Sequence, residues 1–357
     1  MARFHNIKVA DIYKETKDCS VLSFDIPEEL ISEFQYKQGQ HLTLRTTIDG
    51  EEVRRSYSLC SSPIENKWKV AVKKINGGLF STFVNDTLKK GDAIEIMAPN
   101  GIFNTEVNPT QAKNYIAFAA GSGITPILSI IKTHLALEPK STFKLFYLNR
   151  TVKSIIFKEE IEQLKNVYFD RFEIFHFLTK EHRSIELLNG RFTKEKLKVL
   201  TSKIIDIPSV DECFICGPEE MIFLIRDELV AAGLNKNKVH FELFSTGNSD
   251  ADKQRVSKIL EKKVEGTEVT IIDGGKEFHF TMDDDFDNIL DGALAAGADL
   301  PFACKGGVCS TCRCKIISGT VEMKINYALD EEEVAKGLIL SCQAVPTSQN
   351  VVVEFGV

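Results

Sequence analysis

Four cysteines near the end of the chain have a spacing that suits iron. Cys304, Cys309 and Cys312 stand with four and then two residues between them, and Cys342 follows after twenty-nine more. Plant-type [2Fe–2S] clusters use this spacing, because soft, anionic thiolates hold iron well. Structural zinc is the alternative, but zinc sites usually take two well-separated ligand pairs, whereas three cysteines crowd one loop here. We therefore predict that these four cysteines bind a [2Fe–2S] cluster.

Five further cysteines remain outside this set, and they are Cys19, Cys60, Cys213, Cys216 and Cys314. The odd total of nine argues against a disulfide framework and for a reducing compartment. Cys213 and Cys216 form a C-x-x-C pair within an apolar strand, where residues three apart face opposite sides of the sheet. That placement disfavours a redox or zinc pair. Cys314 is expected to be exposed and not to serve as a cluster ligand.

The tetrapeptide Arg55-Ser56-Tyr57-Ser58 carries a second kind of chemistry. An arginine can neutralise a pyrophosphate, and a tyrosine can stack on a flat ring. A later loop, Gly77-Gly78, is followed by the hydroxyls of Ser81 and Thr82 at the start of a predicted helix. Glycines let a backbone approach a pyrophosphate, and a helix N-terminus favours anions. The alternatives are a core position for Tyr57 and a plain hairpin turn for the glycines.

Two more loops follow apolar strands and suit a dinucleotide. Gly121-Ser-Gly123-Ile-Thr125-Pro126 lies between a buried strand and a helix, which is the context of a phosphate-binding turn. It departs from G-x-G-x-x-G, because proline, tolerated in a first helical turn, replaces the third glycine. Cys216-Gly217-Pro218 ends another strand, at the sheet edge where ligands bind in such folds.

Two positive side chains bear on which dinucleotide binds. Arg150 follows a predicted strand, where a residue usually discriminates the ribose 2-prime position. Lys180 follows the next strand, after Thr179. Positive charge at these points suits a 2-prime phosphate and favours NADPH, with NADH as the less favoured alternative.

Hydrophobic periodicity predicts the elements that position these residues. Short strands with glycine-rich turns between them are expected at 5–13, 20–26, 41–48, 54–59, 68–74 and 93–97, which favours a six-stranded antiparallel β-barrel. Strands and helices then alternate as in a parallel α/β sheet, with strands at 115–120, 143–148, 172–178, 212–216 and 239–244 and helices at 127–137, 156–164, within 187–200 and at 218–232.

The last part of the chain is predicted to contain a hairpin, a helix and further strands. The hairpin joins 264–273 to 277–282 around Gly274-Gly275, the helix spans 288–296, and strands follow at 313–317 and 351–355. A polar stretch precedes it and is interpreted as a linker. The expected division is a barrel at 1–107, a nucleotide domain at 108–245, a linker at 246–263 and a cluster domain at 264–357.

Length, charge and composition narrow the class of protein. A chain of 357 residues is too long for one ordinary core, so several domains are expected. No apolar run is long enough to span a membrane, and the first residues lack the apolar core of a signal peptide, so a cytoplasmic location is expected. From Val264 onward sixteen acidic residues outnumber six basic ones. This asymmetry favours electrostatic docking, or only solubility, and no nucleic-acid footprint is present.

Taken together, R-x-Y-S, the Gly-Gly loop, Gly-x-Gly-Ile-Thr-Pro and Cys-Gly-Pro-x-x-Met resemble the ferredoxin–NADP reductase superfamily over about residues 1 to 245. The tail from about 264 resembles a plant-type ferredoxin with the α+β β-grasp fold. The order, reductase first and ferredoxin last, is similar to that of the reductase subunits of the phenylacetyl-CoA epoxidase family.

The resemblance implies roles for named residues. FAD would be held by Arg55, Ser56, Tyr57 and Ser58, with Lys73, Gly78, Ser81 and Thr82 near its phosphates. Thr125 would approach the flavin from the nucleotide domain. NADPH would meet Gly121, Gly123, Arg150, Lys180, Gly217 and Pro218, with Tyr57, Ser58 and Cys216 closest to the reacting rings. Glu242 and Phe244 match a glutamate and an aromatic residue that relatives often carry, without an assigned role here.

The implied activity is that of an NAD(P)H-dependent oxidoreductase. NADPH would reduce the flavin, and the cluster would pass single electrons to an oxygenase, most simply a di-iron oxygenase of the phenylacetyl-CoA epoxidase type. Another hydroxylase, a desaturase or a hybrid-cluster protein is an alternative acceptor. A metal-binding module without catalysis is the rival of a different class, and the nucleotide motifs argue against it.

Overall fold

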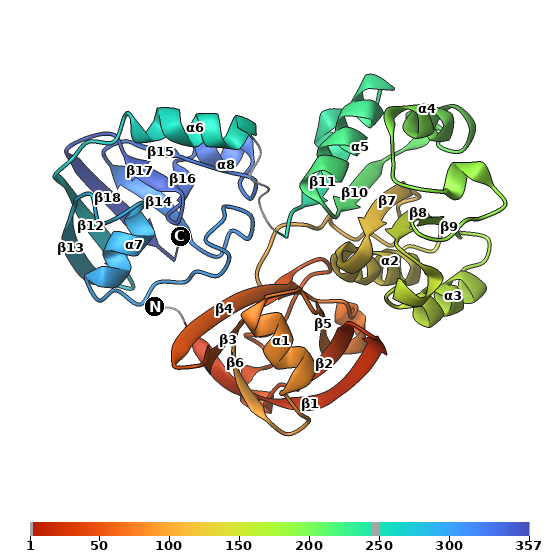
Figure 1. The fold of residues 1–357 in the computed structure, drawn as a ribbon, viewed down its shortest axis with the longest axis horizontal. Coiled ribbons are helices and arrows are strands. Elements are labelled where there is room, and N and C mark those ends of the chain that lie inside the picture. Colours follow the sequence, from red (N-terminus) through yellow and green to blue (C-terminus); the bar gives the residue numbers. More distant parts are fainter. Residues whose placement is uncertain (1–2, 245–249, 357) are drawn as a thin grey trace. The chain divides into compact units, whose positions relative to one another are not determined.

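A computed structural model of the chain describes residues 3–244 and 250–356, with side chains left out at 250–253. One compact unit comprises His5–Val53 and Tyr57–Glu242, and most of the remaining described residues follow Glu242 and form a second compact unit. The first unit contains a six-stranded and a five-stranded sheet, and the second contains a mixed five-stranded sheet with a small two-stranded one (Figure 1). This is the predicted multidomain fold.

The six-stranded antiparallel sheet has the order β4-β3-β6-β1-β2-β5 and corresponds to the predicted barrel. Its strands are β1 (Phe4–Thr16), β2 (Cys19–Asp25), β3 (His41–Ile48), β4 (Glu51–Ser58), β5 (Trp68–Lys73) and β6 (Ala93–Met97). Alternating apolar residues fill its interior, among them Leu22, Leu42 and Ile96. Helix α1 (Leu79–Asp86) packs on this core through Phe80 and Val84. The short helices η1 (Glu28–Leu30) and η2 (Pro63–Glu65) lie between strands.

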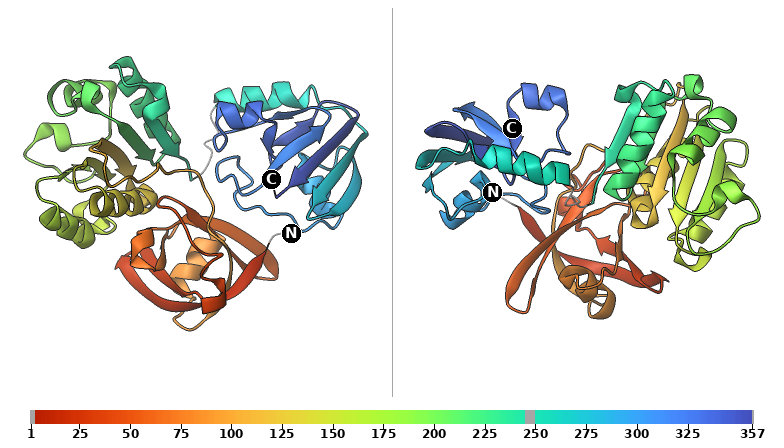
Figure 2. Two further views of the ribbon diagram at one scale, coloured as in Figure 1. Left: turned by 180° about the vertical axis from the view of Figure 1, so that it is seen from behind. Right: turned by 45° about the horizontal axis from the view of Figure 1, so that its top comes forward.

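The five-stranded parallel sheet has the order β11-β10-β7-β8-β9. Its strands are β7 (Asn114–Ala120), β8 (Thr142–Asn149), β9 (Phe172–Leu178), β10 (Glu212–Cys216) and β11 (Val239–Glu242). Helices α2 (Ile124–Leu137) and α3 (Lys158–Val167) lie along one face, and α4 (Lys194–Lys203) and α5 (Glu219–Ala231) along the other (Figures 1 and 2). Both faces are therefore covered, as the continuous apolar runs predict. The short helices are η3 (Gly121–Gly123), η4 (Val152–Ser154), η5 (Glu186–Leu188), η6 (Ile207–Ser209) and η7 (Lys236–Lys238).

The strand order places a topological switch point between β7 and β10. From β7 the chain adds β8 and β9 on one side, and then returns to add β10 and β11 on the other. The helices that follow β7 and β10 therefore cover opposite faces of the sheet, and in such folds ligands bind in a crevice at the carboxyl ends of the two strands. Both predicted nucleotide loops begin there, Gly121 after β7 and Gly217 after β10.

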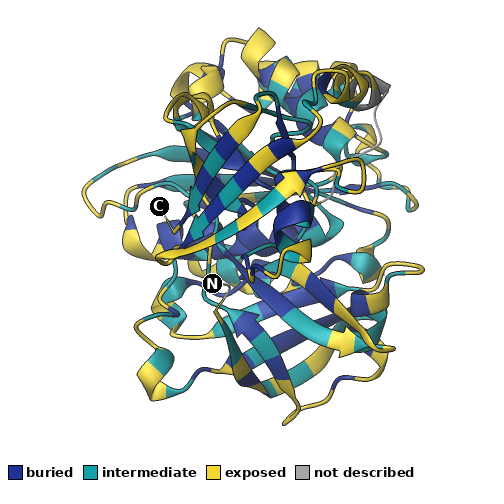
Figure 3. Ribbon diagram, turned by 90° about the vertical axis from the view of Figure 1, so that its left-hand side faces the viewer, coloured by how far each residue is buried: buried dark blue, intermediate teal, exposed yellow. Residues whose placement is uncertain are grey.

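The second unit contains the predicted hairpin and helix. The sheet order is β13-β12-β18-β14-β16, in which β12 and β18 are parallel and the other pairs antiparallel, as in a β-grasp. The strands are β12 (Thr267–Asp273), β13 (Lys276–Met282), β14 (Arg313–Ser318), β16 (Leu338–Leu340) and β18 (Asn350–Phe355), with β15 (Val321–Met323) and β17 (Ala344–Pro346) in the small sheet. Helix α7 (Ile289–Ala295) packs on this sheet, where buried and exposed residues alternate along the strands (Figure 3).

Two helices of the second unit were not predicted. Helix α6 (Asp250–Leu260) lies within the stretch interpreted as a linker, and α8 (Glu331–Ala335) is a short acidic helix. Ile259 of α6 is buried, so a mostly polar composition concealed a helix that is anchored by a few apolar side chains. Among the described residues, no helix is both long enough and apolar enough to cross a membrane.

A buried carboxylate links α2 to the segment that joins the barrel to the parallel sheet. Glu138 is fully buried and accepts hydrogen bonds from Tyr115 (2.9 Å), Ser141 (2.8 Å) and His134 (2.9 Å). The Gln111 side chain, in the joining segment, donates a further bond of 2.5 Å. Burial alone would raise the pKa of Glu138, but these donors outweigh it and bring the pKa down to about 2.

We expect Glu138→Gln to lower the free energy of unfolding by about 2–4 kcal/mol at pH 7, because the donors around the carboxylate lose a charged acceptor. A carboxyl whose pKa is depressed in the folded chain stabilises it fully above the unfolded pKa, and this contribution is lost as the pH falls toward the folded value. In urea titrations followed by circular dichroism, the gap between variant and wild type should stay constant from pH 8 to about pH 5.5 and narrow below about pH 4.5. An unchanged gap at pH 3.5 would contradict this assignment.

Candidate functional site

The four predicted cluster cysteines come from two segments of the second unit. Cys304, Cys309 and Cys312 lie in the loop before β14, and Cys342 lies between β16 and β17. Cys309, Cys312 and Cys342 are buried, and Cys304 is partly buried. The Cys309 side chain is the largest influence on the pKa of Cys304, and that of Cys312 is the largest influence on the pKa of Cys342. The sulfurs therefore form two pairs.

Pairing of this kind suits two irons rather than one ion. A [2Fe–2S] cluster takes two protein ligands on each iron. A tetrahedral zinc site would need four ligands around one point. The residues present thus fit the cluster better than they fit zinc.

Backbone N–H groups in the loop favour thiolates. Gly306 N lies 3.3 Å from the Cys304 sulfur. The neighbouring Cys309 side chain, together with the backbone of Val308 and Gly306, lowers the pKa of Cys304 to about 6 despite burial. The neighbouring Cys312 side chain and the N–H of Gly307 likewise lower the pKa of Cys342.

Cys314 differs from its sequence expectation. It is fully buried in β14, opposite Ile339 of β16, rather than exposed. Strand periodicity explains this, since Cys312 and Cys314 are two residues apart and both belong to the core. Burial raises the pKa of the Cys314 thiol, which keeps it protonated and inert.

The predicted flavin residues lie on neighbouring elements of the barrel. Arg55 is exposed on β4, and Tyr57 is partly buried, with its ring centroid 5.7 Å from that of Phe80 in α1. Tyr57 is therefore neither a core residue nor fully exposed. The α1 N-terminus begins at Gly78, as the Gly-Gly loop predicted. A side chain on Gly78 would meet the Ser81 hydroxyl at 2.7 Å, so the loop excludes larger residues there.

One hydroxyl and one ammonium group of this region are held by neighbouring residues. The Ser81 hydroxyl accepts a hydrogen bond from Ile75 N at 3.1 Å and donates to Gly78 O at 3.2 Å, so it shapes the loop. Lys73, at the end of β5, lies 3.7 Å from Asp18. Its ammonium would lie 3.9 Å from a Cβ on Gly121, which brings it beside the nucleotide loop.

The nucleotide loops at the switch point touch each other closely. A Cβ on Gly123 would lie 2.2 Å from Cys216 O, so only glycine fits between the two loops. Gly217 is less confined, because a Cβ there would lie 2.5 Å from the end of the flexible Met221 side chain. Thr125 is buried and donates to Ser122 O at 3.0 Å. Pro218 occupies the N-cap position of α5.

A hydrogen bond joins the flavin strand to this crevice. The Ser58 hydroxyl at the end of β4 donates to Glu242 Oε2 at 3.1 Å. Glu242 ends β11 and pairs in register with Cys216 of β10. Burial raises the pKa of Glu242 to about 8, although the bond from Ser58 opposes the shift. Burial, with the Glu242 charge adding to it, also raises the pKa of Cys216.

Glu242 is thus the site residue to which the sequence analysis assigned no role. It ionises near neutral pH beside Ser58 and Cys216, both of which were predicted. Phe244 is 44% exposed and lies beyond this contact. A glutamate at the end of the last strand was the only signal available, and its partner is 184 residues away in the chain.

The two predicted phosphate-binding cations lie side by side at another part of the same sheet edge. β8 ends at Asn149 and β9 at Leu178, so Arg150 and Lys180 follow strand ends directly. Lys180 N donates to Arg150 O at 2.8 Å, which fixes the two backbones together. Both side chains are exposed. Positive charge therefore gathers at the carboxyl edge, where the adenosine end of a dinucleotide would lie.

Comparison with known families divides the chain into three matched regions. Residues 6–105 match the oxidoreductase FAD-binding domain, residues 118–227 the oxidoreductase NAD-binding domain, and residues 271–347 the 2Fe-2S iron-sulfur cluster binding domain. The chain thus contains domains for FAD, a nicotinamide dinucleotide and a [2Fe–2S] cluster, in the order that the sequence predicted.

Curated relatives align over nearly the whole chain. One of them, a component of 1,2-phenylacetyl-CoA epoxidase from Escherichia coli (strain K12), is 41% identical over 99% of this chain and 98% of its own length. The ferredoxin reductase component of 3-ketosteroid-9-alpha-monooxygenase from Rhodococcus rhodochrous is 33% identical over 98% and 96%. The glycine betaine monooxygenase reductase subunit from Pseudomonas aeruginosa is 28% identical over 98% and 95%.

Solved structures share the fold at lower identity. Phthalate dioxygenase reductase aligns with a TM-score of 0.59 and 24% identity over 99% of this chain and 98% of its own. A ferredoxin NADP+ reductase from Neisseria gonorrhoeae aligns with a TM-score of 0.58 and 21% identity over 68% of this chain and 99% of its own. The matched domains and the 41% identical relative together show that the chain belongs to the family of FAD- and NAD-binding oxidoreductases with a C-terminal plant-type [2Fe–2S] domain, the reductase components of oxygenases.

Proposed function

We propose that this chain oxidises NADPH and delivers single electrons, by way of FAD and a [2Fe–2S] cluster, to an oxygenase of the phenylacetyl-CoA epoxidase type. The observation that carries the proposal is the 3.1 Å hydrogen bond between Ser58 and Glu242. It joins the end of the flavin strand to the strand pair whose carboxyl end faces the nucleotide crevice. A nicotinamide beside Cys216 and a flavin along β4 would therefore be neighbours.

The residues divide by task. We assign Arg55, Ser56, Tyr57 and Ser58, with Gly78, Ser81, Thr82 and Thr125, to FAD, and Gly121, Gly123, Gly217 and Pro218 to the dinucleotide. Lys73 reaches both groups, because it ends a barrel strand and approaches Gly121. Ser58 and Cys216 would border the reacting rings, and Glu242 would hold or release a proton beside them. The FAD domain would span 1–107, the dinucleotide domain 108–245, the linker 246–263 and the cluster domain 264–357.

The cofactors supply the redox chemistry, since a bound flavin accepts two electrons as a hydride and a [2Fe–2S] cluster carries one at a time. The chain's own contribution is to position and to tune. Buried glycine contacts hold the nucleotide loop, and backbone N–H groups near Cys304 and Cys342 stabilise negative sulfur. No further general base is required by this scheme.

The choice of acceptor rests on similarity alone. The relative that is 41% identical belongs to phenylacetyl-CoA epoxidase, and the relative that is 33% identical belongs to a 3-ketosteroid monooxygenase. We favour the first, with a di-iron oxygenase as partner in the cytoplasm. Rapid mixing with NADPH and then NADH, with flavin bleaching and cluster reduction followed separately, tests the proposal. A chain that shows no paramagnetic iron signal after anaerobic reduction would refute it.

Arg150→Gln is expected to raise the KM for NADPH about 10- to 100-fold and to leave the KM for NADH within about twofold, because a 2-prime phosphate loses one charge-assisted bond. Steady-state kinetics with ferricyanide as acceptor measure both constants. Lys153→Gln, on the same segment but outside the proposed phosphate contact, serves as the matched control. Equal effects on the two dinucleotides would show that Arg150 does not read the phosphate.

Cys342→Ser and Cys314→Ser separate a ligand from a neighbouring core cysteine. Cys342→Ser should abolish or shift the visible absorption and paramagnetic signal of the reduced cluster, and should slow cytochrome c reduction about tenfold or more while flavin reduction persists. Cys314→Ser should keep both signals but lose about 1–3 kcal/mol of stability, because it buries a hydroxyl. Retention of a normal cluster in Cys342→Ser would exclude this residue as a ligand.

The pKa of about 8 for Glu242 predicts a pH-dependent rate. At pH 7 the carboxyl is mainly neutral, and above pH 8 it places a negative charge beside the ring that must accept a hydride. The rate of flavin reduction by saturating NADPH should therefore fall as the pH rises through about 8. Glu242→Gln keeps the neutral form, so its rate should stay flat between pH 6.5 and 9.5. The prediction fails if both proteins show the same decline.

A further inference from the structure

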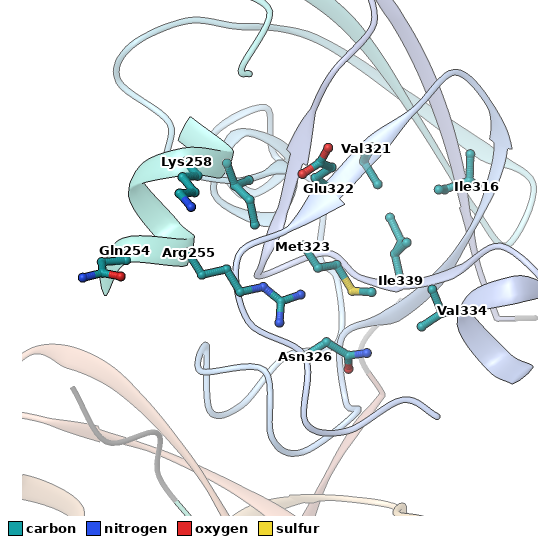
Figure 4. Close-up of a pocket in the computed structure, with 11 residues that line it drawn as sticks. Gln254, Arg255, Lys258, Ile316, Val321, Glu322, Met323, Asn326, Val334 and Ile339 are labelled. Carbon is teal, nitrogen blue, oxygen red and sulfur yellow. The ribbon is translucent and has the colours of Figure 1, made fainter. Parts of the chain in front are cut away.

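A groove of about 710 Å³ lies in the second unit, between helix α6 and the strands beside the cluster loop (Figure 4). Its floor is apolar and includes Ile316, Met323, Val334 and Ile339. Of these, Val334 is 39% exposed, so water reaches part of the floor. A recess of this size matches the volumes that ligands and recognition segments fill.

The α6 rim of the groove carries positive charge. Arg255 and Lys258 line the α6 side, and both are exposed. Neither forms an ion pair with any residue whose side chain the structure describes. The Arg255 side chain reaches from α6 toward Met323 and Asn326 (Figure 4). On the other side Val334 belongs to α8, whose Glu332 and Glu333 form ion pairs with Lys336 and Arg313. Glu322 also lines the groove and forms an ion pair with Lys262.

One wall of the groove belongs to the segment from 323 to 327, which is hydrogen-bonded to the cluster loops and is called the cover here. Met323 accepts a hydrogen bond through sulfur from Leu340 N, at 3.3 Å, two residues before Cys342. Lys324 N donates to Gln343 O at 2.9 Å, and Tyr327 N donates to Gly307 O at 3.0 Å. The segment from 323 to 327 is therefore bonded to both loops that hold the predicted ligands. Whatever fills the groove contacts this cover directly.

We propose that the groove is a docking site for the oxygenase component. Its occupant would be an amphipathic segment with an apolar ridge and an acidic side chain toward Arg255 and Lys258. The positive rim beside the apolar floor favours a segment with an acidic group at that place, which gives specificity. Seating there would bring the acceptor against the cover of the cluster. This inference rests on the proposed function.

The groove depends on helix α6, which is not part of the matched cluster domain. The helix precedes β12 and lies outside the residues matched as the cluster domain, 271–347. It contributes both cations of the groove within a domain that is otherwise strongly acidic, with sixteen acidic and six basic residues from Val264 onward. Acidic surface alone would attract any basic protein, whereas the α6 rim selects a partner with an acidic group at a defined place.

The test is a double charge reversal, Arg255→Glu with Lys258→Glu, in the full-length holoprotein. Lys198→Glu with Lys203→Glu on α4 is the matched control, since it changes net charge equally at exposed sites far along the chain. Three acceptors are compared with NADPH as donor: ferricyanide for the flavin, cytochrome c for the cluster, and the oxygenase component of Escherichia coli phenylacetyl-CoA epoxidase. We expect the KM for the oxygenase to rise about tenfold or more in the first variant alone.

Ferricyanide and cytochrome c reduction and the visible cluster spectrum should be unchanged in both variants. An oxygenase KM that is equal in wild type, control and reversal would overturn the groove proposal while leaving the proposed function intact. Wild-type protein that reduces cytochrome c but never supports oxygenase turnover would overturn the proposed acceptor, and the groove proposal with it. Should the reversal fold poorly, Arg255→Gln with Lys258→Gln asks the same question, with a smaller expected rise of about threefold or more.

Discussion

The close approach of two loops at the switch point between β7 and β10 is the constraint on which the nucleotide site depends. A Cβ on Gly123 would lie 2.2 Å from the carbonyl oxygen of Cys216, well inside van der Waals contact. Without a side chain at this position, the turn after β7 can rest against the end of β10, and α2 can start one residue later. The crevice of the parallel sheet is therefore shaped by backbone, which leaves its carboxyl edge free for a ligand.

A second constraint acts in the cluster domain, where loops rather than a helix or strand must hold the thiolates. Lys305 and Ser310 adopt left-handed backbone conformations, with φ of 50° and 52°, and Gly307 does so with φ of 74°. Non-glycine residues enter this region rarely and at a cost in conformational energy. In this loop the Cys309 and Cys312 side chains, with nearby backbone N–H groups, lower the pKa of Cys304 and Cys342 respectively. The same backbone conformation therefore carries the strain and stabilises the negative sulfurs.

Local patterns in the sequence predicted most of the fold, because strand alternation and apolar runs are properties of neighbouring residues. The barrel strands, the β12–β13 hairpin and the helix at Ile289–Ala295 followed from such patterns. Helix α6 did not, since its polar composition resembles a linker and its anchoring depends on a few contacts such as those of Ile259. The burial of Cys314 was not predicted for a different reason. Its closeness to the cluster loop suggested exposure, whereas strand periodicity places it in the core. The hydrogen bond between Ser58 and Glu242 could not be predicted from the sequence, because the partners are 184 residues apart in the chain.

Polar contacts across the first unit explain why hydride chemistry would be confined to it. Lys132 of α2 lies between Glu65, next to the barrel, and Glu160 of α3, forming ion pairs with both. Ser129 donates to Ser61 O at 2.6 Å, so a second bond crosses the same interface. Such directional contacts, partly buried at Lys132 and buried at Ser129, fix the barrel against the parallel sheet, since each demands one geometry. Transfer of a hydride requires reacting atoms held within about 3–3.5 Å, and a rigid unit meets that demand. The cluster residues belong to the other compact unit, where the requirement is for stabilised thiolates rather than for a shared reacting geometry.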